Sequence, residues 1–153
     1  MYVNEKTSEV MNDLIRINND RIEGYEKAAN ETEPKDVDLQ VIFRQMSAES
    51  RSYVNDLSGF MARSGKEVED DTTLRGKIYR AWMDVKATFS GKDRKTILAS
   101  CEYGEDAAQK AYDTALSSDA ELSTEIRQLI MDQKTSLKRS HDRIKKMRDA
   151  QPA

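Results

Sequence analysis

The residues with the clearest chemical potential in this sequence are carboxylates, amides and hydroxyls spaced so that they could meet inside a fold. They are Asn18, Glu49, Ser50, Tyr53, Glu105 and Gln133. Facing carboxylates can bridge and neutralise divalent cations, and histidine adds a neutral nitrogen ligand. Because this set holds at most two carboxylates and no histidine, it is too poor in charge for a tight two-metal centre.

The sequence contains one histidine and one cysteine. A single chain therefore cannot build a site that needs two imidazoles, an internal disulfide or a thiolate-rich metal site, and a reducing compartment is expected. We expect His141 to be an exposed or bundle-end histidine, opposite about Lys95. We expect Cys101 to be a small buried apolar side chain. The two would then lie at different heights and could not form a nucleophilic pair.

The composition indicates that helices position these residues. The chain has 153 residues, with only six glycines and two prolines, a share typical of an all-α protein of one domain over residues 1–153. Apolar residues recur with a helical period, which predicts helices over residues 4–30, 36–64, 73–90, 93–117 and 119–149. The spacing of Ser118 and Glu121 matches a capping box and predicts the start of the last helix.

The connections predict how these helices are arranged. A short link around Pro34 makes the first two helices antiparallel. The piece over 73–90, with its preceding loop, is long enough to travel the length of a bundle, so the helices on either side of it can run parallel. This is the single long crossover of ferritin-like four-helix bundles. A plain five-helix up-and-down array is the competing topology.

Antiparallel pairing predicts that the polar residues form one layer. Folding the first two helices about their link sets Asn18 opposite about residue 48, close to Glu49 and Ser50. Folding the last two about Ser118 sets Glu105 opposite about residue 131, within a turn of Gln133.

Three segments carry a resemblance to a known family. They are residues 18–25 (NNDRIEGY), 79–82 (YRAW) and 101–108 (CEYGEDAA). Together they resemble an uncharacterised bacterial family of ferritin-like four-helix-bundle proteins, known only as a domain of unknown function. The resemblance covers nearly the whole chain, supports the ferritin-like fold and implies no activity. One departure is Tyr79, where the family often has histidine.

Ferritin-like di-iron proteins take one Glu from each of two helices and a Glu-x-x-His from each of the other two. Here amides and hydroxyls hold most of those places, so the layer is a degenerate metal site. We interpret it as a hydrogen-bonded belt that fixes helix register. Two alternatives stay open: a small-molecule or weak single-metal site using Glu49, Glu105 and Gln133, or a stripe misplaced by one residue.

Charge and hydropathy indicate which classes of partner and which cellular compartment to expect. There are 25 Lys and Arg against 28 Asp and Glu, a net charge of -3, so a nucleic-acid partner is not expected. Basic residues concentrate between Lys134 and Arg148, and again between Arg75 and Lys95, as solvated charge near helix ends. The polar start and the short apolar runs predict a cytoplasmic chain with no membrane partner.

Three classes of function remain. The first is a non-catalytic bundle that needs no cofactor and acts through protein association, as a homo-oligomer or with a protein partner, in a setting such as stress. The second is an atypical ferritin-like metal protein. The third is a small-molecule carrier that uses the polar layer as a pocket. We rank them in that order.

Overall fold

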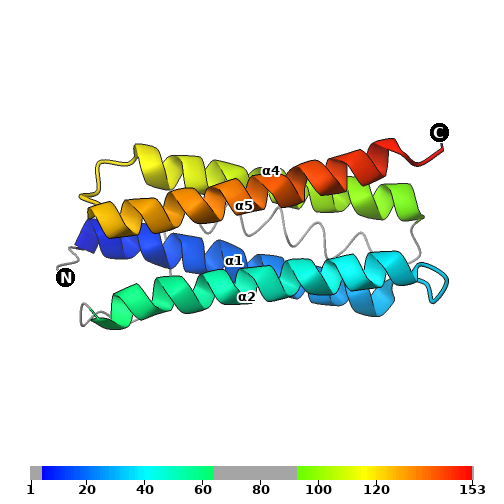
Figure 1. Ribbon diagram of the computed structural model, residues 1–153, viewed down its shortest axis with the longest axis horizontal. Helices are drawn as coiled ribbons and strands as arrows, with labels where there is room; N and C mark the ends of the chain where they lie inside the picture. The colour runs from blue at the N-terminus through cyan, green and yellow to red at the C-terminus, as the bar shows by residue number, and fades with distance from the viewer. Residues whose placement is uncertain (1–4, 64–92, 153) are drawn as a thin grey trace.

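The computed structural model describes residues 5–63 and 93–152, which form four long helices packed side by side as a bundle (Figure 1). The helices are α1 (Glu5–Glu31), α2 (Val37–Arg63), α4 (Arg94–Ser117) and α5 (Thr124–Asp149). The prediction of an all-α four-helix bundle is confirmed. The expected crossover helix over 73–90 lies outside the described residues. The segment that would distinguish a crossover from a five-helix array is the same one.

The helix directions follow from the turns that join them. The link after α1 is tight, because Asp36 N donates to Glu33 O at 2.9 Å, and α2 returns antiparallel to α1. α5 likewise returns antiparallel to α4 (Figure 1). α2 and α4 run in the same direction, with the end of α2 and the beginning of α4 at opposite ends of the bundle.

Side-chain caps set the beginnings of α4 and α5. Asp93 caps α4 by accepting from Thr96 N at 2.8 Å, and Ser123 caps α5 by accepting from Ile126 N at 3.2 Å. The predicted start of the last helix at residue 119 is therefore wrong. Ser118 instead ends α4, where its Oγ donates to Ala115 O at 2.8 Å. The connection is longer than predicted, which changes how α5 pairs with α4.

The apolar core runs along the inward stripes of the helices. Buried members of the predicted stripes include Met11, Leu14, Ile15, Tyr25, Leu39, Phe43, Leu57, Leu98, Tyr112, Ile126, Leu137 and Ile144. Burial of these side chains is the main force that holds an amphipathic bundle together. Among the described helices, none has an apolar stretch of the length that a membrane crossing requires.

Candidate functional site

The centre of the polar layer is a buried arginine. Arg21, on α1, has no exposed surface. Its Nε donates to Glu105 Oε1 on α4 at 2.6 Å, and its Nη1 donates to Ser50 Oγ at 2.7 Å and Met46 O at 3.1 Å on α2. Its Nη2 lies 3.1 Å from Glu49 Oε1. One guanidinium therefore joins three helices through the fixed fork of donors that arginine provides.

Two carboxylates, of Glu105 and Glu49, face this one guanidinium. Burial would lower the pKa of Arg21, but the carboxylates of Glu105 and Glu49, together with Tyr25, outweigh that effect and raise it. Tyr25 donates to Glu105 Oε1 at 2.7 Å, and its ring centroid lies 5.2 Å from the Arg21 guanidinium carbon. Burial, and then the Glu105 charge, raise the pKa of Tyr25. Arg21 is thus a permanent cation and Tyr25 a neutral donor.

A chain of hydrogen bonds leads away from the guanidinium. Ser50 accepts from Arg21 and donates to Asn18 Oδ1 at 2.9 Å, and Asn18 Nδ2 donates to the Tyr112 hydroxyl at 2.9 Å. Tyr112 donates to Gln133 Oε1 at 2.6 Å, and Gln133 Nε2 donates to the carbonyl of Tyr53 at 3.4 Å. In each of these hydrogen bonds the donor is the group nearer to the Arg21 cation along the hydrogen-bonded chain. Hydrogen bonds aligned in one direction in this way polarise one another.

Two residues connect the layer to its outer rim. Glu49, with 26% of its side chain exposed, accepts from Ser140 Oγ on α5 at 2.9 Å. Tyr53 donates to Ser136 Oγ on the same helix. Burial raises the pKa of Tyr53 to about 12 and also raises that of Tyr112. The network thus reaches all four described helices.

The structure brings the six predicted layer residues into this one network: Asn18, Glu49, Ser50, Tyr53, Glu105 and Gln133. The predicted facing of Asn18 and Ser50 is confirmed. The predicted facing of Glu105 and Gln133 is wrong, because Gln133 meets Tyr112, two helical turns along α4 from Glu105. The late start of α5 accounts for the difference.

Sequence reasoning missed Arg21, Tyr25 and Tyr112 as members of the network. Arg21 lies three residues after Asn18 and four before Tyr25, a spacing that puts all three on one helix face. That spacing was the available signal. A charged residue on a predicted inward face indicates a buried partner, and Glu105 was already a candidate.

A two-metal centre of the di-iron type does not fit this layer. Such a centre needs carboxylates gathered around cations, whereas the carboxylates here are held by the Arg21 guanidinium. Glu105 Oε1 accepts from both Arg21 and Tyr25. Glu105 Oε2 has no hydrogen-bond partner within the described ranges, and a single oxygen does not make a two-metal site. The cation that the carboxylates of Glu49 and Glu105 face is the Arg21 guanidinium.

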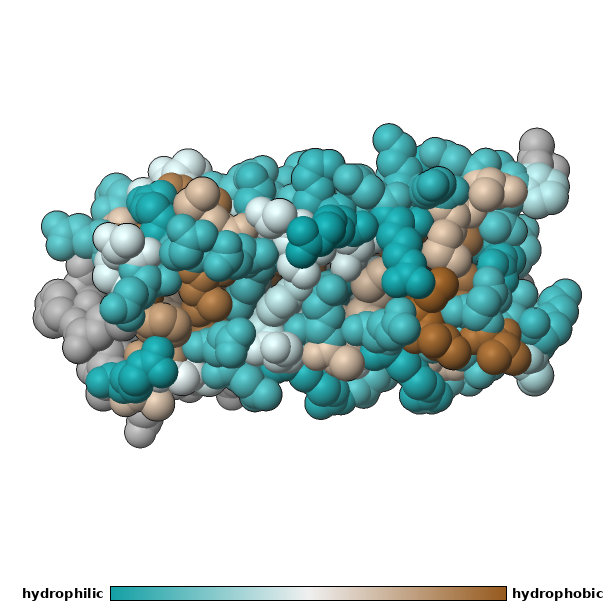
Figure 2. Space-filling model, viewed as in Figure 1, coloured by the Kyte–Doolittle hydropathy of each residue, from teal (hydrophilic) through white to brown (hydrophobic). Residues whose placement is uncertain are grey.

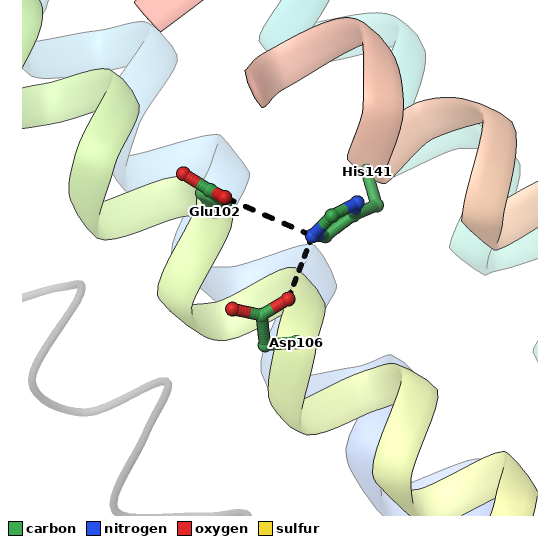
Figure 3. Close-up of side chains that lie close together, drawn as sticks. All are labelled: Glu102, Asp106 and His141. Atoms are coloured by element: carbon green, nitrogen blue, oxygen red, sulfur yellow. Dashed lines mark ion pairs between the residues drawn. The ribbon is translucent and has the colours of Figure 1, made fainter.

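The predictions for the single cysteine, Cys101, and the single histidine, His141, have different outcomes. Cys101 is fully buried, as predicted, and burial raises the pKa of its thiol. His141 is not an exposed histidine opposite Lys95. It faces Glu102 and Asp106 on α4, and 16% of its side chain is exposed (Figure 3). The longer connection before α5 moves the histidine along α4 to this position.

The basic residues of α5 pair with acids at the surface. Lys134 lies 2.5 Å from Asp113, and Lys138 lies 3.0 Å from Asp142. Lys134 and Lys138 lie before the last turn of α5, which contains Lys146 and Arg148, so the predicted position near the helix end holds only for part of this basic segment.

Residues 6–118 match the model of a family described as a domain of unknown function, DUF2383. No curated protein has a significant match to the chain.

Proposed function

Because the chain belongs to this DUF2383 family, whose function is unknown, its own geometry must indicate its role, and we propose a non-catalytic protein that acts through association. It would be a ferritin-like bundle in which a structural polar layer replaces the di-iron centre. The parallel directions of α2 and α4 support the ferritin-like arrangement (Figure 1).

The observation that carries this proposal is the position of Arg21. A catalytic centre needs groups that are free to meet a substrate or a cofactor. Here Glu105, Glu49 and Ser50 all interact with the same buried guanidinium. The hydrogen bonds and ion pairs of these three side chains are used to join helices. That is the role of a polar belt that fixes helix register.

Association is supported by apolar side chains left at the surface. Val37 and Val41 lie one turn apart near the beginning of α2 and are 59% and 50% exposed. Figure 2 shows apolar side chains gathered over this end of α2. A twofold-related copy of the chain would present the same pair, so self-association would cover both. A second copy is therefore the partner that we propose.

The structural role of the layer is tested by metal analysis. A tag-free chain with His141→Gln is purified without chelators, exposed anaerobically to iron(II) and manganese(II), and analysed for bound metal. The substitution removes the single histidine of the sequence, which lies outside the layer, and leaves every layer residue unchanged. We expect no stoichiometric metal in this variant. Two metals per chain would overturn the proposal.

Self-association is tested by light scattering after size-exclusion chromatography. The wild-type chain should show a mass above the 17.5 kDa of one chain. Replacing Val37 and Val41 together by serine should return the mass to that of one chain. Replacing exposed Met131 by serine is the matched control and should leave the assembly intact. A wild-type chain that stays monomeric at all concentrations would rule out self-association.

A further inference from the structure

Outside the buried layer, three side chains with metal-ligating atoms converge on the flank of the α4–α5 hairpin. Glu102 and Asp106 lie one helical turn apart on α4, and His141 projects toward them from α5 (Figure 3). We propose that these three residues bind one divalent transition-metal ion, with zinc as the best fit. This site uses none of the layer residues, so it stands independently of the proposed function.

The separations between the ligand atoms suit one shared ion. His141 Nε2 lies 2.6 Å from Asp106 Oδ1 and 3.9 Å from Glu102 Oε1, and the three ligand atoms lie within 4.8 Å of one another. Two ligands at a tetrahedral angle on one zinc ion lie about 3.4 Å apart, because the bonds are about 2.0 to 2.2 Å long. The observed distances bracket this value, so rotations about side-chain bonds would bring the atoms onto one ion.

Neighbouring residues orient two of the ligands. Asp142 Oδ1 lies 3.0 Å from His141 Nδ1 and can accept a hydrogen bond from it. Without an ion, Nε2 donates to Asp106 Oδ1 at 2.6 Å; a bound ion would displace that Nε2 proton and use the Nε2 lone pair, while Nδ1 keeps its proton toward Asp142. Nε2 is the atom that faces Glu102 and Asp106 (Figure 3). Arg148 pairs with Oε2 of Glu102 and so leaves Oε1 toward the histidine. A carboxylate behind a ligating imidazole is a common arrangement at protein metal sites.

Charge and exposure also favour a cation here. Three carboxylates, of Glu102, Asp106 and Asp142, are set against the two cations Lys138 and Arg148, which leaves one net negative charge from these five side chains around His141. The exposed fraction is 54% for the Asp106 side chain and 12% for Glu102. Water can therefore reach the open side and complete the coordination.

The ligand types select the metal. One imidazole nitrogen with two carboxylate oxygens suits zinc, whereas calcium and magnesium favour oxygen ligands alone. Manganese(II) should bind more weakly than zinc, following the general order of divalent affinities. The site should therefore discriminate zinc from manganese and calcium.

The test uses the fact that the chain has one histidine. In a tag-free protein every imidazole ring signal in an NMR spectrum belongs to His141. Zinc chloride should shift these signals and saturate at one zinc per chain, with the same stoichiometry by titration calorimetry. Glu102→Gln should lower zinc affinity about tenfold or more, and His141→Gln should lower it further.

The matched control is Asp113→Asn, another exposed acidic residue of α4 that lies outside the cluster. It should leave zinc affinity unchanged, and circular dichroism should show that all variants fold. Ring signals that zinc does not move, or equal zinc affinity in wild type and His141→Gln, would overturn the proposal. Calcium that shifts the signals as zinc does would also overturn it, because the cluster would then be only a negative patch. Two metals retained in His141→Gln would instead contradict the proposed structural role of the layer. Failure of the zinc site and failure of the proposed function therefore give different results.

Discussion

Arg21 Nε donates to Glu105 Oε1 at 2.6 Å, and neither side chain has any exposed surface. A buried ion pair of this kind pays a desolvation cost that its Coulombic attraction offsets only with good geometry. Ser50 and Glu49 on α2 contact the Arg21 guanidinium, and Tyr25 on α1 donates to Glu105, which completes the geometry around the pair. The pair is therefore better understood as a device that specifies one packing of the helices than as a large net source of stability.

Loss of one partner of the Arg21–Glu105 pair should lower stability by an amount that depends on which charge is left buried. Arg21→Met keeps most of the apolar stem but leaves Glu105 buried without its cation, and should lower the free energy of unfolding by about 3 to 5 kcal/mol. Glu105→Leu should cost less, because Glu49 still faces Arg21. Urea unfolding followed by circular dichroism measures both changes. A gain in stability in Glu105→Leu would show that the carboxylate is a spare group.

The double variant, Arg21→Met with Glu105→Leu, completes a mutant cycle. Because both charges leave together, its loss should be smaller than the sum of the single losses by about 1 to 3 kcal/mol. Additive losses would mean that the two residues are not coupled, which contradicts the contact.

The Tyr112 hydroxyl is the link between α1 and α5. Tyr112→Phe removes it and leaves the buried Gln133 oxygen without its donor, so stability should fall by about 1 to 3 kcal/mol. Tyr103→Phe makes the same chemical change on the same helix at a residue that is 58% exposed. That control should change stability by less than about 0.5 kcal/mol. Equal effects in the two variants would argue against the hydrogen-bonded chain.

Periodicity was enough to predict the four described helices, apart from the start of the last one, and six members of the layer. A residue on an apolar stripe faces the core whatever its neighbours are, so Asn18, Ser50 and Glu105 could be placed inside from spacing alone. The facing of α1 and α2 was predictable too, because their link is short around Pro34 and leaves little freedom in register.

The contacts within the layer depended on details that spacing does not contain. The register of α5 on α4 depends on where the turn ends, and Ser118 and Ser123 are both competent caps. Because α5 begins later than predicted, its observed register on α4 places His141 beside Asp106 and Gln133 beside Tyr112. Periodicity also cannot distinguish a buried arginine from a solvated one, because that depends on a partner carboxylate from another helix.

The start of α5 gives a direct test of that turn. Ser123→Ala removes the side-chain oxygen that accepts from Ile126 N and should cost about 1 kcal/mol. Glu121→Ala should have little effect, because Glu121 precedes the helix and does not close a capping box with Ser118. Thermal unfolding of the two variants measures the difference. A larger loss in Glu121→Ala would place the helix start at residue 119.

Buried tyrosines should make the fold sensitive to alkali. The pKa of Tyr53 is raised from 10.0 to about 12 in the folded chain, so the unfolded state loses this proton first as pH rises. The stability that this group contributes is complete below pH 10 and is lost as pH rises toward 12. In Tyr53→Phe the decline should be shallower, by at most about 1.4 kcal/mol per pH unit. Denaturant unfolding at several pH values above 9 measures both slopes, and parallel slopes would contradict the raised pKa.

The Cys101 thiol reports whether the core opens. It has no exposed surface, and burial, followed by the Glu105 charge, raises its pKa, so little reactive thiolate is available in the folded chain. A chromogenic disulfide reagent should therefore label native protein slowly and label urea-unfolded protein at once. Arg21→Met should speed native labelling, because destabilising the layer one turn from the thiol raises the population of open states. Tyr103→Phe should label at the wild-type rate. Fast labelling of the native wild-type chain would show that the interior around Cys101 is accessible, which a closed structural layer does not allow.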